Sequence, residues 1–217
     1  MDPVTGDPAA KVTPLVRATG WEVGLRSTPV PAWQTTLSLW RLDLGSELIF
    51  TGDSGTTEAS RPTRRVGVEW NHEVRLGLGL TVNADLAWSR ARYRDFDPAG
   101  DRVPAAIQGV GVVGIAWKAT ESLDLSALDR YFGPRDLVED GRVRSRSSNL
   151  VQLQARWKPT PHWTFTVDLF NAFDAQVADI DYLYTSRLPG EPAGGVEDLH
   201  THPVEPRTLR AGVRLTF

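Results

Sequence analysis

The stretch "EDLHTHPVE", residues 197–205, gathers side chains that could bind a metal ion. Its candidate ligands are Asp198, His200, His202 and Glu205. Imidazole and carboxylate groups are ligands that zinc and other transition metals accept in proteins. Two histidines among carboxylates are also ordinary chemistry for a polar loop. The stretch therefore supplies candidates, and no metal site is predicted from it.

Two further motifs suggest enzyme chemistry and lack its context. "GVGVVG", residues 109–114, matches the dinucleotide pattern G-x-G-x-x-G, but it lies in a strand pattern and is followed by another strand rather than a helix. "GDSG", residues 52–55, resembles the nucleophile loop of chymotrypsin-like proteases, in which the catalytic base precedes the serine. Here the first histidine, His72, comes after Ser54. We expect no enzyme, no cofactor and no catalytic residue.

Composition narrows the class of protein further. The chain has 217 residues, of which 41% are hydrophobic, so it can build a packed core. A formal net charge of -3 gives no reason to expect nucleic acid as a partner. The absence of cysteine excludes disulfides and thiolate metal sites. No run of about 18 apolar residues predicts a transmembrane helix, and the start "MDPVTGDPAAKVTP" lacks the apolar region of a signal peptide.

Apolar and polar residues alternate along most of the sequence, which predicts strands. "NLVQLQARWK" (149–158), "HWTFTVDLF" (162–170) and "TLRAGVRLTF" (208–217) show the pattern most clearly. The connections alternate between short turns and long polar loops, as in an up-and-down sheet with its turns at one edge and its loops at the other. We expect an all-β, antiparallel, open curved sheet. Its nine strands are predicted at about 16–27, 33–51, 63–71, 78–94, 107–118, 122–132, 147–158, 161–188 and 206–217.

Two of these predicted strands are unusually long. The apolar phase slips at Leu39 and Trp40, and again around "NAFDAQ", residues 171–176. We interpret each slip as a β-bulge within one strand. A short turn is expected at "NHEVRLG", residues 71–77.

An apolar strand face of about ten residues is long enough to cross a bilayer at a tilt. In that case the polar residues of the same strands face a lumen. The candidates are Gln152, Gln154, Arg156, Asp168, Arg210 and Arg214. The alternative is a soluble antiparallel β-sheet module that binds a ligand, with these residues on its solvated face. Alternation alone does not separate the two.

The order of several motifs resembles that of TonB-dependent outer-membrane receptors. "NAFD", residues 171–174, resembles their N-L-F-D segment with alanine in place of leucine, and it is followed by Arg207, Thr208 and the terminal Phe217. "GWEVGLRS" (20–27) and "RRVGVEW" (64–70) resemble upstream strands of the same barrels. The resemblance covers the chain from about Leu15 onward.

This resemblance implies a membrane-embedded part of a barrel of about 22 strands, in the outer membrane of a Gram-negative bacterium. It implies uptake of a scarce small molecule such as an iron-siderophore or cobalamin. The expected partners are membrane lipid, the barrel assembly machinery, which would recognise Phe217, and TonB, through a plug domain not found in this sequence. Complete single-chain barrels have an even number of strands. We therefore expect 1–15 to be an irregular segment and 16–217 to be a C-terminal barrel fragment, inactive and unclosed by itself.

Overall fold

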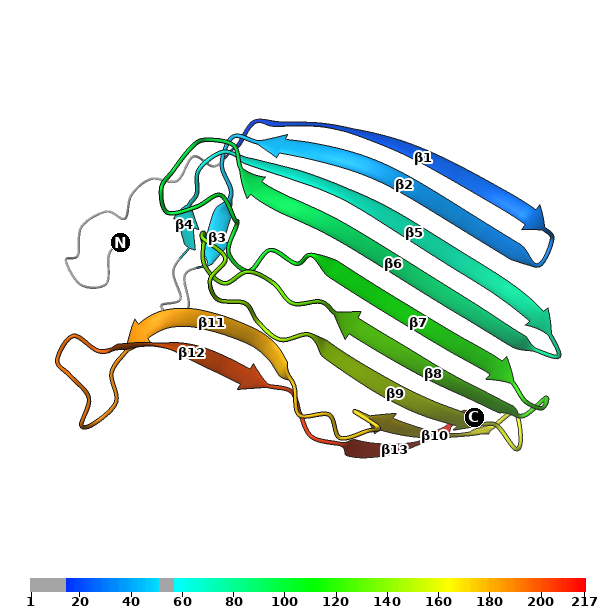
Figure 1. Cartoon of the computed structure of the whole chain (residues 1–217). Helices are drawn as coiled ribbons and strands as arrows, with labels where there is room; N and C mark the ends of the chain where they lie inside the picture. Colours follow the sequence, from blue (N-terminus) through cyan, green and yellow to red (C-terminus); the bar gives the residue numbers. More distant parts are fainter. Residues whose placement is uncertain (1–14, 51–56) are drawn as a thin grey trace.

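The structure, a computed structural model, describes residues 15–50 and 57–217. Nine antiparallel strands form the main sheet in the order β1-β2-β5-β6-β7-β8-β9-β10-β13 (Figure 1). They are β1 (Ala18–Val30), β2 (Trp33–Leu44), β5 (Thr63–Gly77), β6 (Leu80–Tyr93), β7 (Gly109–Lys118), β8 (Leu123–Phe132), β9 (Ser148–Trp157), β10 (Trp163–Phe170) and β13 (Thr208–Leu215). The described residues contain no helix that could span a membrane.

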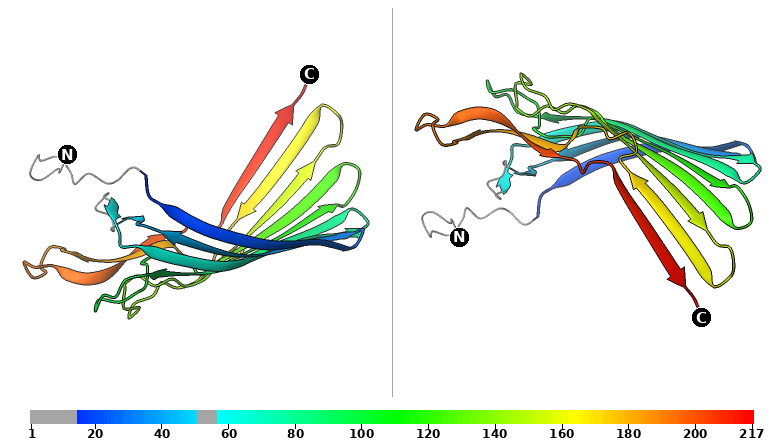
Figure 2. Two further views of the ribbon diagram at one scale, coloured as in Figure 1. Left: turned by 90° about the horizontal axis from the view of Figure 1, so that it is seen from above. Right: turned by 90° about the horizontal axis from the view of Figure 1, so that it is seen from below.

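The main sheet is open and curved. Figure 2 shows its strands fanning around a bend, with β1 at one edge and β13 at the other. No pairing joins these two edge strands in the described residues. The expected all-β, nine-stranded, open curved sheet is therefore confirmed.

Most strands have an apolar face and a polar face, because successive side chains point to opposite sides of the sheet. Residues opposite each other in the register share a side, so each face continues from strand to strand. Trp21, Val23 and Leu25 of β1 lie on the apolar face, which continues across the sheet to Leu209, Val213 and Leu215 of β13. Asp129 of β8 is an acidic exception on this face. Leu25 is 67% exposed and Leu209 is 69% exposed. Nothing in the described chain covers this face of the edge strands.

The prediction of a bulge at Leu39 and Trp40 is wrong. Every residue of β2 from Trp33 to Leu44 pairs with β5 without a shift in register. Trp40 lies directly opposite Gly67 on the polar face, and a Cβ at Gly67 would be 2.5 Å from the indole ring. The bare glycine makes room for the ring, so the strand needs no bulge there.

The ends of two predicted strands are also corrected. The strand predicted at 33–51 ends at Leu44, and residues further on form the hairpin of β3 (Leu48–Phe50) and β4 (Thr57–Ala59). The turn predicted at 71–77 is wrong, because β5 continues to Gly77 and the chain reverses at Leu78 and Gly79. Gly77, Leu78 and Gly79 all have positive φ, so a two-residue reversal is possible there.

The strand predicted at 161–188 is two strands. β10 ends at Phe170, and β11 (Ala178–Ser186) pairs with β12 (Val196–Pro203) in a separate two-stranded sheet. Between them Asn171 (φ 45°) and Asp174 (φ 55°) are left-handed. The second slip is therefore a break in the strand and no bulge, and the expected loop at 188–206 contains β12.

The Asn171 side chain holds this break in place. Its Nδ2 donates to the carbonyls of Ala175 and Glu205, both at 3.1 Å, and its Oδ1 accepts from the Ala175 N–H at 2.8 Å. The Asp174 carboxylate accepts from the Arg207 N–H at 2.9 Å. The buried Asn171 and the exposed Asp174 thus join the end of β10 to the start of β13.

We predict that Asn171→Ala lowers the free energy of unfolding by about 2 to 3 kcal/mol, because it removes a buried amide that makes three hydrogen bonds to the backbone. Urea unfolding in detergent micelles measures this loss. Asn149→Ala, which removes an exposed asparagine amide from β9, is the control and should cost less than about 0.5 kcal/mol. Equal losses in the two variants would contradict this role for Asn171.

Candidate functional site

The long connections all lie at the same end of the strands of the main sheet, which we call the loop edge. They join β2 to β5, β6 to β7, β8 to β9 and β10 to β13. The tight reversals that follow β1, β5, β7 and β9 lie at the opposite edge, the turn edge (Figure 1). The hairpin of β11 and β12 also extends from the loop edge. The expected sorting of long and short connections is confirmed.

A small buried core lies at the loop edge. Ala91 and Tyr93 at the end of β6 pack with Val103 of the connection that follows, and Ala106 packs against them. Much of the rest of the sheet is exposed or half-buried on both faces. The loops are thus folded onto the strand ends rather than extended away from them.

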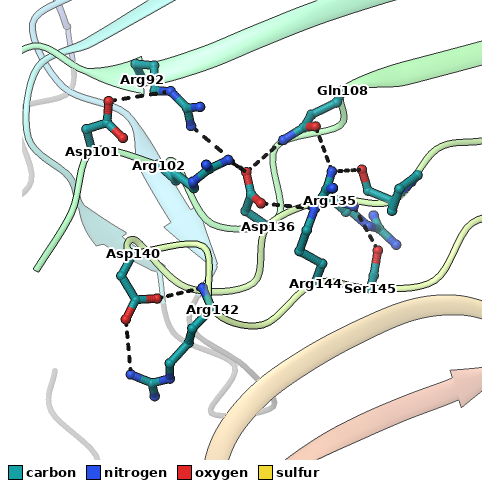
Figure 3. A network of polar contacts seen from close by, with 11 residues as sticks. Arg92, Asp101, Arg102, Gln108, Arg135, Asp136, Asp140, Arg142, Arg144 and Ser145 are labelled. Atoms are coloured by element: carbon teal, nitrogen blue, oxygen red, sulfur yellow. Dashed lines mark hydrogen bonds and ion pairs between the residues drawn. The ribbon is translucent and has the colours of Figure 1, made fainter.

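Asp136 is a buried acid with several partners in these loops. It lies between β8 and β9 and is 2% exposed. Its Oδ2 accepts from Arg102 Nη1 and from Gln108 Nε2, both at 2.8 Å, and Arg144 Nε lies 3.2 Å from its Oδ1 (Figure 3). The Arg92 guanidinium is 4.0 Å away. The hydrogen bond to Asp136 raises the pKa of Arg102 above its usual value.

A second cluster of contacts is centred on Arg61, which joins three connections. Its Nη2 donates to the Gly100 carbonyl at 2.9 Å and to Glu139 Oε2 at 2.7 Å, and Nη1 lies 3.4 Å from Asp95. Its guanidinium is stacked 4.0 Å above the Tyr93 ring, a favourable cation-π geometry. The connections before β5, after β6 and after β8 are therefore held together by one side chain.

Other contacts extend this network. Arg142 binds Glu197 of β12 at 2.9 Å, which ties the connection after β8 to the hairpin. Arg65 of β5 binds Glu47 at 2.5 Å, and Thr63 also donates to Glu47. Burial would raise the pKa of Glu47, but the hydrogen bonds from Arg65 and Thr63 outweigh it and hold that pKa below the usual value. Glu47 therefore stays ionised at neutral pH.

A hollow of about 500 Å³ lies beneath these loops. Its lining includes Trp40, Glu47, Arg65, Glu69, residues 103–108, Ile180 and Tyr182. The indole Nε1 of Trp40 is buried and has no hydrogen-bond partner among the described residues. Aromatic rings and a few polar groups around a concave space suit the binding of a small molecule. We take this hollow as the candidate ligand site.

The six residues predicted to face a lumen all lie on the polar face. Gln154 Nε2 donates to Asp168 Oδ1 at 2.6 Å, and Arg210 binds Asp168 Oδ2 at 3.0 Å. Arg156 pairs with Asp124 at 2.9 Å. Gln152 and Arg214 share the same face. The structure thus joins Gln154, Asp168 and Arg210, and their exposure to a lumen stays a prediction.

The metal candidates do not form a cluster. Asp198, His200 and His202 alternate along β12, where His200 stacks on Tyr184 at 3.6 Å between ring centroids and its Nε2 is 2.9 Å from Ser186 Oγ. The backbone carbonyl of Glu205 accepts from Asn171. Within 15–50 and 57–217, no three His, Asp or Glu side chains are placed to hold a metal ion. Ser54 lies outside the described residues.

The network of Asp136 and Arg61 between the loops is not predicted by the sequence. Asp136 contacts Arg102 and Gln108, which are 34 and 28 residues earlier, and Arg61 contacts Glu139 78 residues later. Alternating acids and arginines in "RDLVEDGRVR", residues 135–144, indicate that ion pairs form. That pattern does not say which residues pair across separate loops.

Comparison with known proteins identifies a family model and solved structures of the same fold. Residues 8–172 match the family model "TonB dependent receptor-like, beta-barrel". A search of curated proteins finds no match.

Several solved structures share the fold. The chain is similar to the ferric-catecholate import receptor Fiu from E. coli K12, with 19% identity and a TM-score of 0.69, covering 93% of this chain and 28% of that one. It is similar to the ferric yersiniabactin uptake receptor FyuA from Yersinia pestis, with 16% identity and a TM-score of 0.70, covering 93% and 30%. The copper transporter OprC is 17% identical, with a TM-score of 0.67, covering 93% and 32%. The chain therefore spans about a third or less of each.

We predict that Asp136→Ala loosens the loop edge, because Arg102 and Arg144 lose a buried counter-charge. Amides in 100–108 and 134–146 should exchange with deuterium at least about tenfold faster, equivalent to about 1.4 kcal/mol of local stability. Hydrogen-exchange mass spectrometry measures this. Asp140→Ala, which removes an exposed carboxylate paired with Arg142, is the control. A network centred on Asp136 would be refuted by equal exchange in the two variants.

Proposed function

The chain belongs to the TonB-dependent receptor family, and we propose that its sheet is part of the barrel of an outer-membrane transporter that takes up a scarce nutrient. The carrying observation is the uncovered apolar face of the nine-stranded sheet. A side chain the size of valine or leucine gains about 1.5 to 3 kcal/mol when it moves from water into an apolar environment. Lipid would provide that environment for a whole face at once.

The two edge strands support a larger barrel. β1 and β13 each pair on one side in the described chain, and lipid cannot satisfy the backbone N–H and C=O groups on the other side. We propose that further strands complete the barrel and that residues 16–217 form its C-terminal part. The segment predicted at 1–15 lies, apart from Leu15, outside the described residues. By itself this sheet would then neither close nor transport.

The proposed partners follow from this location. The apolar face contacts outer-membrane lipid, and the strand that ends at Phe217 is the part that the assembly machinery would recognise. TonB would act through the plug domain that receptors of this family carry. The polar face, with Gln152, Gln154, Arg156, Asp168, Arg210 and Arg214, would line the lumen.

The hollow at Trp40 and Tyr182 is the proposed ligand-contact region. It lies on the side of the sheet that would face the lumen and beneath loops that would face outward. An iron-siderophore or cobalamin is the proposed class of ligand. The names of Fiu and FyuA support an iron chelate, whereas OprC widens the candidates to copper.

Uptake by the host bacterium tests this function. Deleting the coding region for 15–217 from the genome should abolish energy-dependent uptake of one member of a panel of ferric siderophores, cobalamin and copper. Trp40→Ala should reduce that uptake at least about fivefold, because the hollow loses a half-buried aromatic ring from its lining. Radiolabelled uptake measures both, with immunoblotting to confirm equal outer-membrane levels.

Val23→Ala is the matched control, since it shortens an exposed side chain of the apolar face. It should leave uptake within about twofold of the parent. The proposal fails if the deletion strain takes up every member of the panel at the parental rate.

Topology gives a separate prediction. The chain has no cysteine, so single cysteines can report accessibility without background. Ala193→Cys, in the exposed tip between β11 and β12, should react with a membrane-impermeant maleimide on intact cells. Thr160→Cys, in the turn between β9 and β10, should react only after the outer membrane is permeabilised. The reverse pattern would invert the proposed orientation.

A further inference from the structure

The apolar face becomes basic toward the loop edge on three neighbouring strands. On β2, Leu37 and Leu39 are followed by Arg41; on β5, Val68 and Val66 are followed by Arg64; on β6, Leu86 and Trp88 are followed by Arg90 and Arg92. Arg94 comes directly after β6. We call Arg41, Arg64, Arg90, Arg92 and Arg94 the arginine patch. The patch directly borders the uncharged part of the apolar face, which we call the apolar belt, and Trp88 lies at the boundary on β6.

The acids nearby do not neutralise this patch. Asp43 is shared, since it binds Arg41 and Arg64 at 2.8 Å and lies 3.7 Å from Arg94. Arg92 lies 3.5 Å from Asp101, which is more than half exposed, and 4.0 Å from Asp136, which is shared with Arg102 and Arg144. Asp95 also lines the hollow at the patch and lies 3.4 Å from Arg61. Arg90 is exposed and has no hydrogen-bond or ion-pair partner among the described residues. The patch therefore carries an excess of positive charge.

The register places like charges against each other. Arg64 is directly opposite Arg92 in the pairing of β5 with β6, and Arg90 is two residues before Arg92 on the same face. Like charges opposite each other in a sheet destabilise the pairing. A bound anion would relieve this repulsion, whereas one shared carboxylate at Asp43 relieves it in part.

The patch also forms a hollow large enough for such an anion. A concave space of about 710 Å³ is lined by Gly45, Pro62, Arg64, Val66, Arg90, Arg92, Tyr93, Arg94 and Asp95. Guanidinium groups bind phosphate oxygens in a bidentate fork and are preferred for phosphate recognition. Val66 at one side of the hollow continues into the apolar belt. The space thus offers a charged end and an apolar end.

We propose that the arginine patch binds the phosphate monoester of a membrane lipid whose acyl chains lie along the apolar face. The ligand must carry both parts, because the guanidinium groups and the belt adjoin on the same side of the sheet. The patch lies on the face opposite the hollow at Glu69 and Trp40, so this lipid is distinct from any transported molecule. This inference rests on the proposed location of the protein in the outer membrane.

The test uses protein purified from the host outer membrane in a non-ionic detergent, and the double variant Arg90→Gln/Arg94→Gln. Tryptophan fluorescence, to which Trp88 contributes, is titrated with bisphosphorylated lipid A, dephosphorylated lipid A, phosphatidylglycerol or inorganic phosphate. Bisphosphorylated lipid A should bind at least about tenfold more tightly than each of the others. The double variant should lose about tenfold of that affinity. Arg26→Gln/Arg75→Gln, an equal loss of charge on the polar face, should change it less than twofold.

Equal affinity for phosphorylated and dephosphorylated lipid A would overturn the proposal. Equal loss in the two double variants would overturn it too, since net charge would then explain binding. Tighter binding of inorganic phosphate than of lipid would assign the patch to a soluble anion and also refute the lipid. If the protein fractionates outside the outer membrane, the proposed function fails; if it fractionates there and uptake is normal while lipid binding is absent, this inference alone fails.

Discussion

The alternation of side chains across a single layer of strands is the constraint on which the whole structure depends. In a soluble sandwich, the apolar face of one sheet packs against another layer. Here the nine strands form one layer, and Val23 and Leu25 have nothing over them in the described chain. The stability of such a layer must come from backbone pairing and from a solvent that favours its apolar face. In the proposed outer-membrane location, a bilayer would supply that solvent.

The same constraint explains where the buried residues lie. A single layer has no interior, so close packing is confined to the loop edge, where connections fold onto strand ends. Asp136 and Arg61 replace a hydrophobic core there by joining loops through charge-assisted hydrogen bonds. Charges held in this way fix the geometry of the loops, since each has several partners in defined directions. A ligand hollow beneath them can then be preformed.

The sequence predicts the features that depend on neighbours along the chain. Nine strands, their two faces and the sorting of turns and loops all follow from a period of two and from turn residues. The errors arise where a residue far away in the chain decides. Trp40 is accommodated by Gly67, which removes the need for a bulge. Asn171 ends β10 through a bond to Glu205, 34 residues later, and the Asp136 network likewise depends on pairing between loops.

Charge is distributed according to the two faces. On the polar face, Asp168 pairs with Arg210 and Asp124 with Arg156 across neighbouring strands, so these acids and bases neutralise each other. On the apolar face of β2, β5 and β6, arginines begin after the belt ends and exceed their acidic partners. Unpaired charge in hydrocarbon costs several kcal/mol, which restricts it to the zone where water and lipid phosphate are both in reach. One alternation of residue types thus gives the sheet one face of paired charges and another whose basic residues lie where the apolar strands meet the loops.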